Sequence, residues 1–376
     1  MMVAALRRRS GFSLMEMVVT LGVLGMVTFF LTDLLVRQSR TYTVVDDVSE
    51  AQQSLRAVTG LIERELRSTG FMVPAAAIVC GWDMPSVAAS DQTPDVLYVT
   101  DADAIDPTGR SSLNDQAAAV TSGFTGTGED ALVLATLVVG GSPLVVDGSP
   151  FYDLDGDGVA ESDFLYTVAP ARSGGVIVVD RANPDRGAAC GVITDIDTGT
   201  NTVTVDFEVR NAPNAPAGAG AAPGGTPLGA GAPADLVAVP AHVYWVNPNA
   251  PNGPPQLIRD GMVLATDVED LQLAFFFDGV NTGTIDAGEY RGSMSAGGLP
   301  YDYQSKDEDH SLLREVRVTV VARTRTEDPD VLVNPDLANS VMQAAENRPV
   351  GAVVDGFRRR TITLTVRPRN ANADRI

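Results

Sequence analysis

The sequence is poor in the residues from which most catalytic and metal centres are built. Of its 376 residues, two are histidines, His242 and His310, and two are cysteines, Cys80 and Cys190. The histidines lie far apart, and neither cysteine has a histidine beside it. No G-x-S-x-G elbow, P-loop or H-E-x-x-H motif occurs. These absences argue against a His-based catalytic or zinc site, and we expect the chain not to be an enzyme.

Basic residues are also in short supply. Lysine and arginine together number 27 against 48 aspartates and glutamates, which gives a formal net charge of −21. A protein that binds nucleic acid needs a basic surface to neutralise the phosphates. The composition therefore argues against nucleic acid as a general partner, and it fits an exposed soluble surface with possible sites for divalent cations.

Residues 12–36 form a long apolar run that contains no basic residue and two acids, Glu16 and Asp33. At about 1.5 Å per residue this run can cross a hydrocarbon core of about 30 Å. Three arginines at residues 7–9 precede it, and such a basic flank stays in the cytoplasm. We expect residues 12–36 to be the transmembrane half of an N-terminal helix, with the rest of the chain facing the periplasm or the cell exterior.

The sequence Gly-Phe-Ser-Leu-Met-Glu at residues 11–16 resembles the class III leader junction of type IV pilins and pseudopilins. The resemblance implies that residues 1–11 are a leader. The prepilin peptidase would cut it between Gly11 and Phe12 and methylate the new N-terminus. Glu16 matches the fifth mature residue of that superfamily. The alternative is an ordinary N-terminal membrane anchor, which needs neither the glycine nor the acid.

Glu16 is the residue to which this resemblance gives an assembly role. A carboxylate within lipid costs at least about 2–3 kcal/mol and usually marks a function. The Glu16 carboxylate could pair with the Phe12 ammonium of a neighbouring subunit, so that assembly satisfies a charge that a lone subunit cannot. Asp33 lies near the far end of the span, where water can reach it, and we assign it no role.

The helical pattern continues beyond the span as an amphipathic half over residues 37–70. Gly70 is a suitable C-terminal cap, and Pro74 prevents the helix from resuming. We expect this half to pack on a sheet of the same subunit; the alternative is a free coiled-coil stalk. Its apolar stripe, at spacings of three and four, consists of Val44, Val48, Ala51, Leu55, Val58, Ile62 and Leu66.

Residues 71–376 read as a β-rich head without long helices between the strands, so the fold class is α+β with mostly antiparallel strands. An Ala/Gly/Pro-rich segment at residues 211–235 cannot bury a core, and we expect it to be a mobile loop. Whether the parts on either side of it are separate domains stays open. The expected strands are residues 96–100, 131–139, 175–179, 202–209, 236–246, 271–277, 316–323 and 361–367.

Four segments are similar to PilW-type minor pilins: residues 54–71, 268–273, 313–318 and 357–367. This resemblance implies a low-abundance subunit that helps to initiate a type IV pilus and sits at or near the filament tip, with other minor and major pilins as partners. The protein would begin in the inner membrane with a periplasmic head and end in a pilus at the cell surface. The alternatives are a minor pseudopilin of type II secretion, similar to pseudopilin J, and a tip-borne adhesin.

The two cysteines lie outside the apolar span, on the side that we expect to be oxidising. A disulfide between Cys80 and Cys190 is therefore plausible, and closing a loop of about 100 residues would stabilise the fold by about 4–5 kcal/mol in the chain-entropy model. The alternative is a pair of buried free thiols.

An acidic segment at residues 153–163, DLDGDGVAESD, has the spacing of the start of a calcium loop. Its twelfth position is Phe164 in place of the usual glutamate, and β-type runs flank it, so it is not an EF-hand. The alternative is an acidic hairpin turn. The expected Ca²⁺ ligands are Asp153, Asp155, Asp157, the Val159 carbonyl, Glu161 and Asp163. A second, weaker stretch contains Asp278, Asn281, Asp286 and Glu289.

Overall fold

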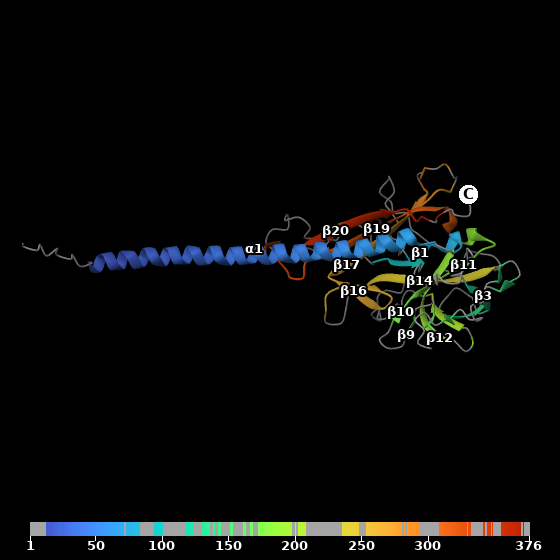
Figure 1. Cartoon of the computed structure of the whole chain (residues 1–376). Helices are drawn as coiled ribbons and strands as arrows, with labels where there is room; N and C mark the ends of the chain where they lie inside the picture. Colours follow the sequence, from blue (N-terminus) through green and yellow to red (C-terminus); the bar gives the residue numbers. More distant parts are fainter. Residues whose placement is uncertain are drawn as a thin grey trace, which may run out of the picture. The chain divides into compact units, whose positions relative to one another are not determined.

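The chain divides into two compact units, with the boundary between Ser49 and Glu50. A single long helix, α1, runs from Leu14 to Ser68 and crosses this boundary (Figure 1). The computed structural model describes residues 13–70, 73–82, 94–100, 118–122, 129–135, 138–139, 142–143, 151–152, 161–162, 166–167, 172–197, 200, 202–207, 235–247, 253–279, 282, 284–286, 288–292, 308–328, 330–331, 341–342, 344–346, 348, 355–369 and 371.

The two halves of α1 differ in what surrounds their apolar side chains. Every described side chain from Ser13 to Thr43 is exposed. From Ala51 onward the predicted apolar stripe is buried, and Leu55, Ile62 and Leu66 are completely inaccessible to solvent. The helix therefore packs on a sheet in its second half, as its periodicity predicts, and the free-stalk alternative is wrong.

The helix ends where its sequence predicts, and the head fixes that end. Gly70 adopts a φ of 80°, a left-handed conformation that glycine allows without strain. Its amide donates to the Thr100 hydroxyl at 3.1 Å, and the Thr69 hydroxyl donates to the Ile78 carbonyl. Hydrogen bonds thus join the last turn of α1 to Ile78, just before strand β1 (Val79–Trp82), and to Thr100, at the end of strand β2 (Val96–Thr100).

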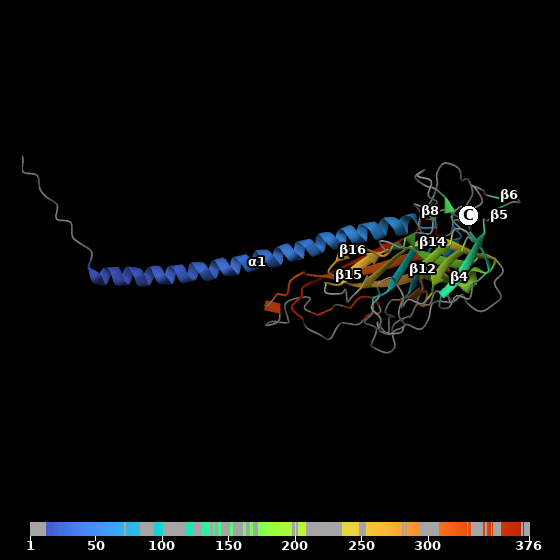
Figure 2. The ribbon, with the colours of Figure 1, turned by 90° about the horizontal axis from the view of Figure 1, so that it is seen from below.

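Six antiparallel strands close into a small barrel in the head. Hydrogen bonding runs in the order β14, β11, β12, β13, β4 and β3, and β3 pairs again with β14, so the path returns to its start. Figure 2 labels β14, β12 and β4 among the strands of the head. The barrel strands are β3 (Ala118–Ser122), β4 (Glu129–Ala135), β11 (Gly175–Asp180), β12 (Ala188–Asp197), β13 (Thr202–Asp206) and β14 (Leu236–Asn247).

The barrel interior is filled mostly by small and branched side chains, together with one aromatic ring, Phe207. Five of the six strands contribute buried side chains to one cluster and β3 adds the partly buried Val120, as expected for the face that the barrel encloses. On β11, Val176 and Val178 belong to this cluster, while Ile177 and Val179 face the opposite way into a second cluster. The interior cluster is Leu132, Val176, Val178, Ala189, Ile193, Val203, Val205, Phe207, Leu236 and Ala238, with Val120 beside it.

A second layer covers the outside of the barrel. Strand β2 (Val96–Thr100) pairs with residues 241–244 of β14, and β1 (Val79–Trp82) pairs with β2. The short helix η1 (Ala75–Ala77) precedes both strands. Their side chains meet the outer face of β11 and β12 in the second cluster. Strands β15 (Gln256–Arg259) and β16 (Met262–Thr266) continue the same sheet on the other edge of β14.

The third core lies between the second half of α1 and two sheets. A four-stranded sheet, in the order β18, β17, β19 and β20, supplies one side, and β1, β2, β14 and β15 supply the other. Figure 1 shows β17, β19 and β20 near the later part of α1. The strands are β17 (Val268–Phe277), β18 (Tyr290–Arg291), β19 (Leu313–Arg323) and β20 (Arg359–Val366).

The fold class is α+β, since all strand pairs among the described residues are antiparallel and α1 is the long helix. Each expected strand overlaps an observed one, whereas β1, β3, β12, β15, β16 and β18 were not predicted. The remaining short elements are β5 (Val138–Val139), β6 (Ser142–Pro143), β7 (Phe151–Tyr152), β8 (Glu161–Ser162), β9 (Tyr166–Thr167), β10 (Arg172–Ser173), η2 (Pro184–Arg186) and η5 (His310–Leu312).

Candidate functional site

The first turn of α1 is closed by a reciprocal pair of hydrogen bonds between Ser13 and Glu16. The Glu16 amide donates to the Ser13 hydroxyl at 3.2 Å, and the Ser13 amide donates to the Glu16 carboxylate at 3.1 Å. This is a capping box, which satisfies amides that the first turn would leave unpaired. The Ser-x-x-Glu spacing was visible in the sequence. Glu16 therefore has a local role that the sequence interpretation missed, beside the predicted role in assembly.

The apolar half of α1 is long and apolar enough to be a candidate membrane anchor. Its threonine hydroxyls are satisfied within the helix: Thr20 donates to the Glu16 carbonyl at 2.9 Å, and Thr28 to the Leu24 carbonyl at 2.8 Å. Asp33 pairs with Arg37 one turn later at 3.0 Å. Such internal pairing lowers the cost of placing polar groups in lipid. The predicted cleavage residues Gly11 and Phe12 lie outside the described residues.

The second half of α1 carries another glutamate in a very different setting. Glu65 is 5% exposed, and the Tyr244 hydroxyl of β14 donates to its carboxylate. Arg259 of β15 donates to the other carboxylate oxygen at 2.7 Å. Burial, followed by the negative charge of Glu65, raises the pKa of Tyr244 far above its usual value, so the phenol stays neutral. These contacts tie the helix to two strands of the same sheet.

The polar contacts continue from Arg259 into the β15–β16 hairpin. Asp260 accepts from the Val243 amide at 2.9 Å, and its other oxygen lies 2.7 Å from His242 Nδ1. Asp260 and Gly261 have φ values of 50° and 75°, typical of a two-residue Asp-Gly hairpin turn. This dipeptide could have predicted the hairpin. His242 is thus held by a turn carboxylate of its own sheet, and its partner explains its position.

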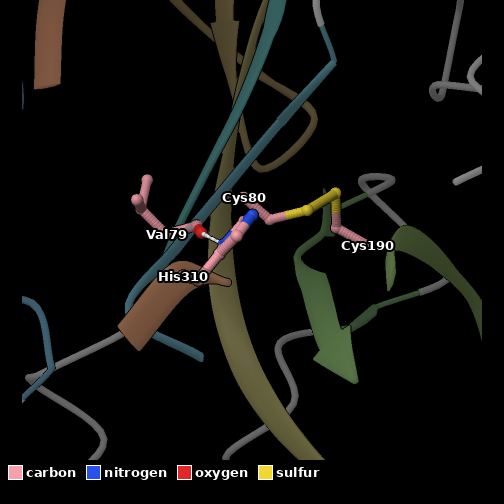
Figure 3. The surroundings of a disulfide bond; sticks show 4 residues. All are labelled: Val79, Cys80, Cys190 and His310. Atoms are coloured by element: carbon pink, nitrogen blue, oxygen red, sulfur yellow. Dashed lines mark hydrogen bonds between the residues drawn. A yellow bond between two sulfur atoms is a disulfide. The ribbon is translucent and has the colours of Figure 1, made fainter. Parts of the chain in front are cut away.

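The cysteine pair is joined, as the sequence favoured. Cys80 on β1 and Cys190 on β12 form a disulfide with a Cα–Cα distance of 6.2 Å, and both side chains are buried. Although three strands separate β1 from β12 in sheet order, the curl of the sheet brings them together. Figure 3 shows the His310 ring beside this bond, with Nδ1 2.7 Å from the Val79 carbonyl oxygen. Burial lowers the pKa of His310 to about 4, which keeps the ring neutral.

The predicted calcium residues Asp153, Asp155, Asp157, Val159 and Asp163 lie outside the described residues. Glu161 begins β8, whose backbone pairs with β7 at Tyr152, so an antiparallel pair brackets the acidic segment. Within the described ranges, no group of three or more His, Cys, Asp or Glu side chains is arranged to hold a metal ion. That statement covers none of these five residues, so calcium binding stays a prediction.

The second acidic stretch is organised by its own hydrogen bonds. Glu289 accepts from the Gly279 amide at 2.9 Å and from the Asp286 amide at 2.8 Å. Asp278 accepts from the Thr282 amide at 2.8 Å and lies 3.4 Å from Arg314. Asn281 is outside the described residues. These bonds give the carboxylates a loop-forming role that explains their spacing without a cation.

Comparison with models of protein families, with curated proteins and with solved structures finds no match to this chain.

Proposed function

We propose that this chain is a minor type IV pilin, a membrane-anchored structural subunit that helps to start pilus assembly at or near the filament tip. The observation that carries the proposal is the leader-like sequence at residues 11–16, together with the long helix that begins at Leu14. That helix is exposed and apolar in its first half and buried against the head in its second. A subunit of this kind can leave the membrane only if other subunits cover the apolar half.

In this proposal, the Glu16 carboxylate sets the register between the α1 helices of neighbouring subunits. The Ser13 amide satisfies one oxygen of the carboxylate, and among the described residues the Glu16 charge has no cation partner. After leader removal, the Phe12 ammonium of a neighbouring subunit would supply the cation. Because an ion pair gains strength in a medium of low dielectric constant, the contact would favour one register of the two helices.

Leader removal is the first test. Gly11→Val should block cleavage, because a branched side chain at the junction should not fit a site that accepts glycine. The mobility of the protein on a gel, with and without the prepilin peptidase, measures this. Normal cleavage of the variant would overturn the assignment to the superfamily.

The second test separates the charge of Glu16 from its capping role. Glu16→Gln removes the charge, while glutamine can still close a capping box. Ser13→Ala removes the hydroxyl partner and keeps the charge. We expect Glu16→Ala and Glu16→Gln to be cleaved but poorly incorporated into sheared filaments, and Ser13→Ala to be incorporated. Wild-type incorporation of Glu16→Gln would show that the charge has no docking role.

A deletion strain distinguishes the pilus from the secretion alternative. Filaments are counted by imaging, and secretion through the type II system is assayed in parallel. Few filaments with normal secretion would support the minor pilin. Normal filaments with lost secretion would favour the pseudopilin, and normal filaments with lost adhesion would favour a tip-borne binding module.

A further inference from the structure

The four-stranded sheet of the head has two edges that the fold treats differently. On the β17 edge, the Asp95 amide donates to the Leu271 carbonyl at 2.8 Å, and the Leu273 amide donates to the Asp95 carboxylate at 2.7 Å. Strand β18 pairs with the next part of that edge. On the β20 edge, residues 360–366 make no backbone hydrogen bond within the described ranges beyond their ladder with β19. One edge of this sheet is thus closed, and the other is open.

Strand β20 is long, regular and uncharged along its middle. It pairs with β19 over all eight of its residues without a register shift, so no bulge interrupts it. Residues 361–366, Thr-Ile-Thr-Leu-Thr-Val, contain no proline and no charge. The threonines are exposed, while Ile362 and Leu364 pack against the core beneath α1. Proteins usually guard such an edge with charge, proline or a bulge, because a regular edge readily pairs with another strand.

The two ends of this uncharged stretch are basic, although the whole chain has a net charge of −21. Residues 356–373 contain five arginines and no acid. Three of these arginines pair with acids of the head, namely Arg358, Arg359 and Arg367. Arg360 and Arg369 have no acidic partner among the described residues. One cation without a counter-charge therefore lies at each end of the open stretch.

We propose that β20 receives one extended segment of a different protein, which adds a strand to the sheet and carries acids near both of its ends. Backbone hydrogen bonds to β20 supply the affinity of such a contact. The acids meet Arg360 and Arg369 and set the register of the added strand. Because Asp95 and β18 occupy the opposite edge, one sheet takes one partner strand, which agrees with a subunit of low abundance.

The charges of β20 also argue against two other occupants. Two copies of β20 paired with each other, in either orientation, would place arginine against arginine at both ends, and like charges opposite each other destabilise a strand pair. An anionic lipid surface would satisfy the arginines, but it has no row of amides and carbonyls to pair with the open edge. An acidic extended segment of another protein satisfies both the charges and the backbone.

The test measures the binding of a labelled peptide to the full chain in detergent by fluorescence anisotropy. The peptide alternates valine and threonine in its centre and carries paired aspartates at both ends, to match the length and charge of β20. Two further forms carry N-methyl groups on alternate amides, each form on one edge of the strand. Because only one edge of a strand can face β20, we expect one methylated form to lose binding and the other to keep it.

Variants of the chain test the two end charges. Arg360→Gln and Arg369→Gln should each weaken peptide binding several-fold, because each removes a cation that the added acids need. Arg181→Gln is the matched control: it removes one charge from the barrel, where Arg181 pairs with Asp235 at 2.8 Å. This control should bind the peptide like the wild type. Equal affinity of all three variants would refute the role of the arginines.

Amide hydrogen exchange locates the contact. The peptide should slow exchange at the β20 amides that do not bond to β19. No peptide binding, equal binding of both methylated forms, or equal slowing by phosphatidylglycerol added to the micelles would each overturn the inference; the last result would identify a lipid-facing edge. The pilin proposal is judged separately, because Gly11→Val and Glu16→Gln test it without any contribution from β20.

Discussion

Glu16 and Glu65 lie on the same helix, and their carboxylates have partners of opposite kinds. Glu16 is exposed and bonds to the amide three residues before it. Glu65 is buried and bonds to Tyr244 and Arg259, which are 179 and 194 positions away. The first contact exists wherever the helix forms; the second exists only when the head has folded. The contact of Glu16 in the first half of α1 thus requires only the helix itself, whereas the contacts of Glu65 in the second half require the folded head.

This difference predicts that internal contacts should control the stability of the head and leave the apolar half of α1 unaffected. Each of the following measurements can be made on the full chain in detergent. Urea unfolding reports the free energy of unfolding of the head, and the helix signal that remains at high urea reports the apolar half. The expected effects are taken from the largest to the smallest.

The disulfide should have the largest effect. Cys80→Ala with Cys190→Ala opens a covalent loop between residues 110 positions apart. The chain-entropy model predicts a loss of about 4–5 kcal/mol in the free energy of unfolding of the head. Mass spectrometry of unreduced peptides should show one linked species in the wild type. Free alkylation of both thiols without reductant, or unchanged unfolding of the double variant, would contradict this.

Glu65→Ala should cost about 3–5 kcal/mol, because it leaves the Tyr244 hydroxyl without its acceptor and takes away the nearer acid of Arg259, whose other acid, Asp260, lies 3.6 Å away. Glu63→Ala is the control on the same turn: its carboxylate pairs with Arg67 at the surface, where such pairs contribute about 0–1 kcal/mol. Similar urea midpoints for the two variants would show that the buried contacts do not fix the helix to the head.

Acid should destabilise the head through His310. Burial lowers the pKa of this histidine to about 4, whereas the unfolded ring titrates near 6.5. Between pH 6.5 and pH 4 the histidine of the unfolded chain binds a proton, whereas the buried histidine of the native chain does not. The free energy of unfolding of the head therefore falls as the pH falls. The loss should approach about 3 kcal/mol by pH 4 and vanish above pH 7. His310→Gln, which can still donate to the Val79 carbonyl, should flatten this part of the pH profile. An unchanged profile would refute the assignment.

Calcium should have the smallest effect, and it should act on the head alone. If Asp153, Asp155 and Asp157 bind Ca²⁺, a free concentration of 100 times the dissociation constant adds about 2.7 kcal/mol, a rise of a few degrees in melting temperature. Asp155→Ala with Asp157→Ala should remove the rise, and Mg²⁺ should give less because it demands stricter octahedral geometry. A titration without heat and an unchanged melting curve would leave these residues as an acidic turn.

Local patterns in the sequence predicted much of the fold. The spacing of Leu55, Val58, Ile62 and Leu66 placed the buried stripe of α1, because a helix repeats every 3.6 residues. Runs rich in valine placed β2, β11 and β14. Strand β12, Ala188–Asp197, was missed because two alanines and a glycine, which have weak strand preference, are among its first four residues.

The sequence by itself determined where the long helix starts and ends, which half is apolar, and which two cysteines can pair. The helix ends and its apolar half depend on residues that are neighbours along the chain, and the cysteine pairing follows because the sequence has only two cysteines. Only the tertiary structure decided that six strands close into a barrel and that Glu65 meets Arg259. The structure also left Met262, Val263 and Leu264 uncovered at the edge of their sheet. The physical reason is that strand pairing joins distant residues through backbone groups, which are the same for nearly every residue type and so leave no trace in the sequence.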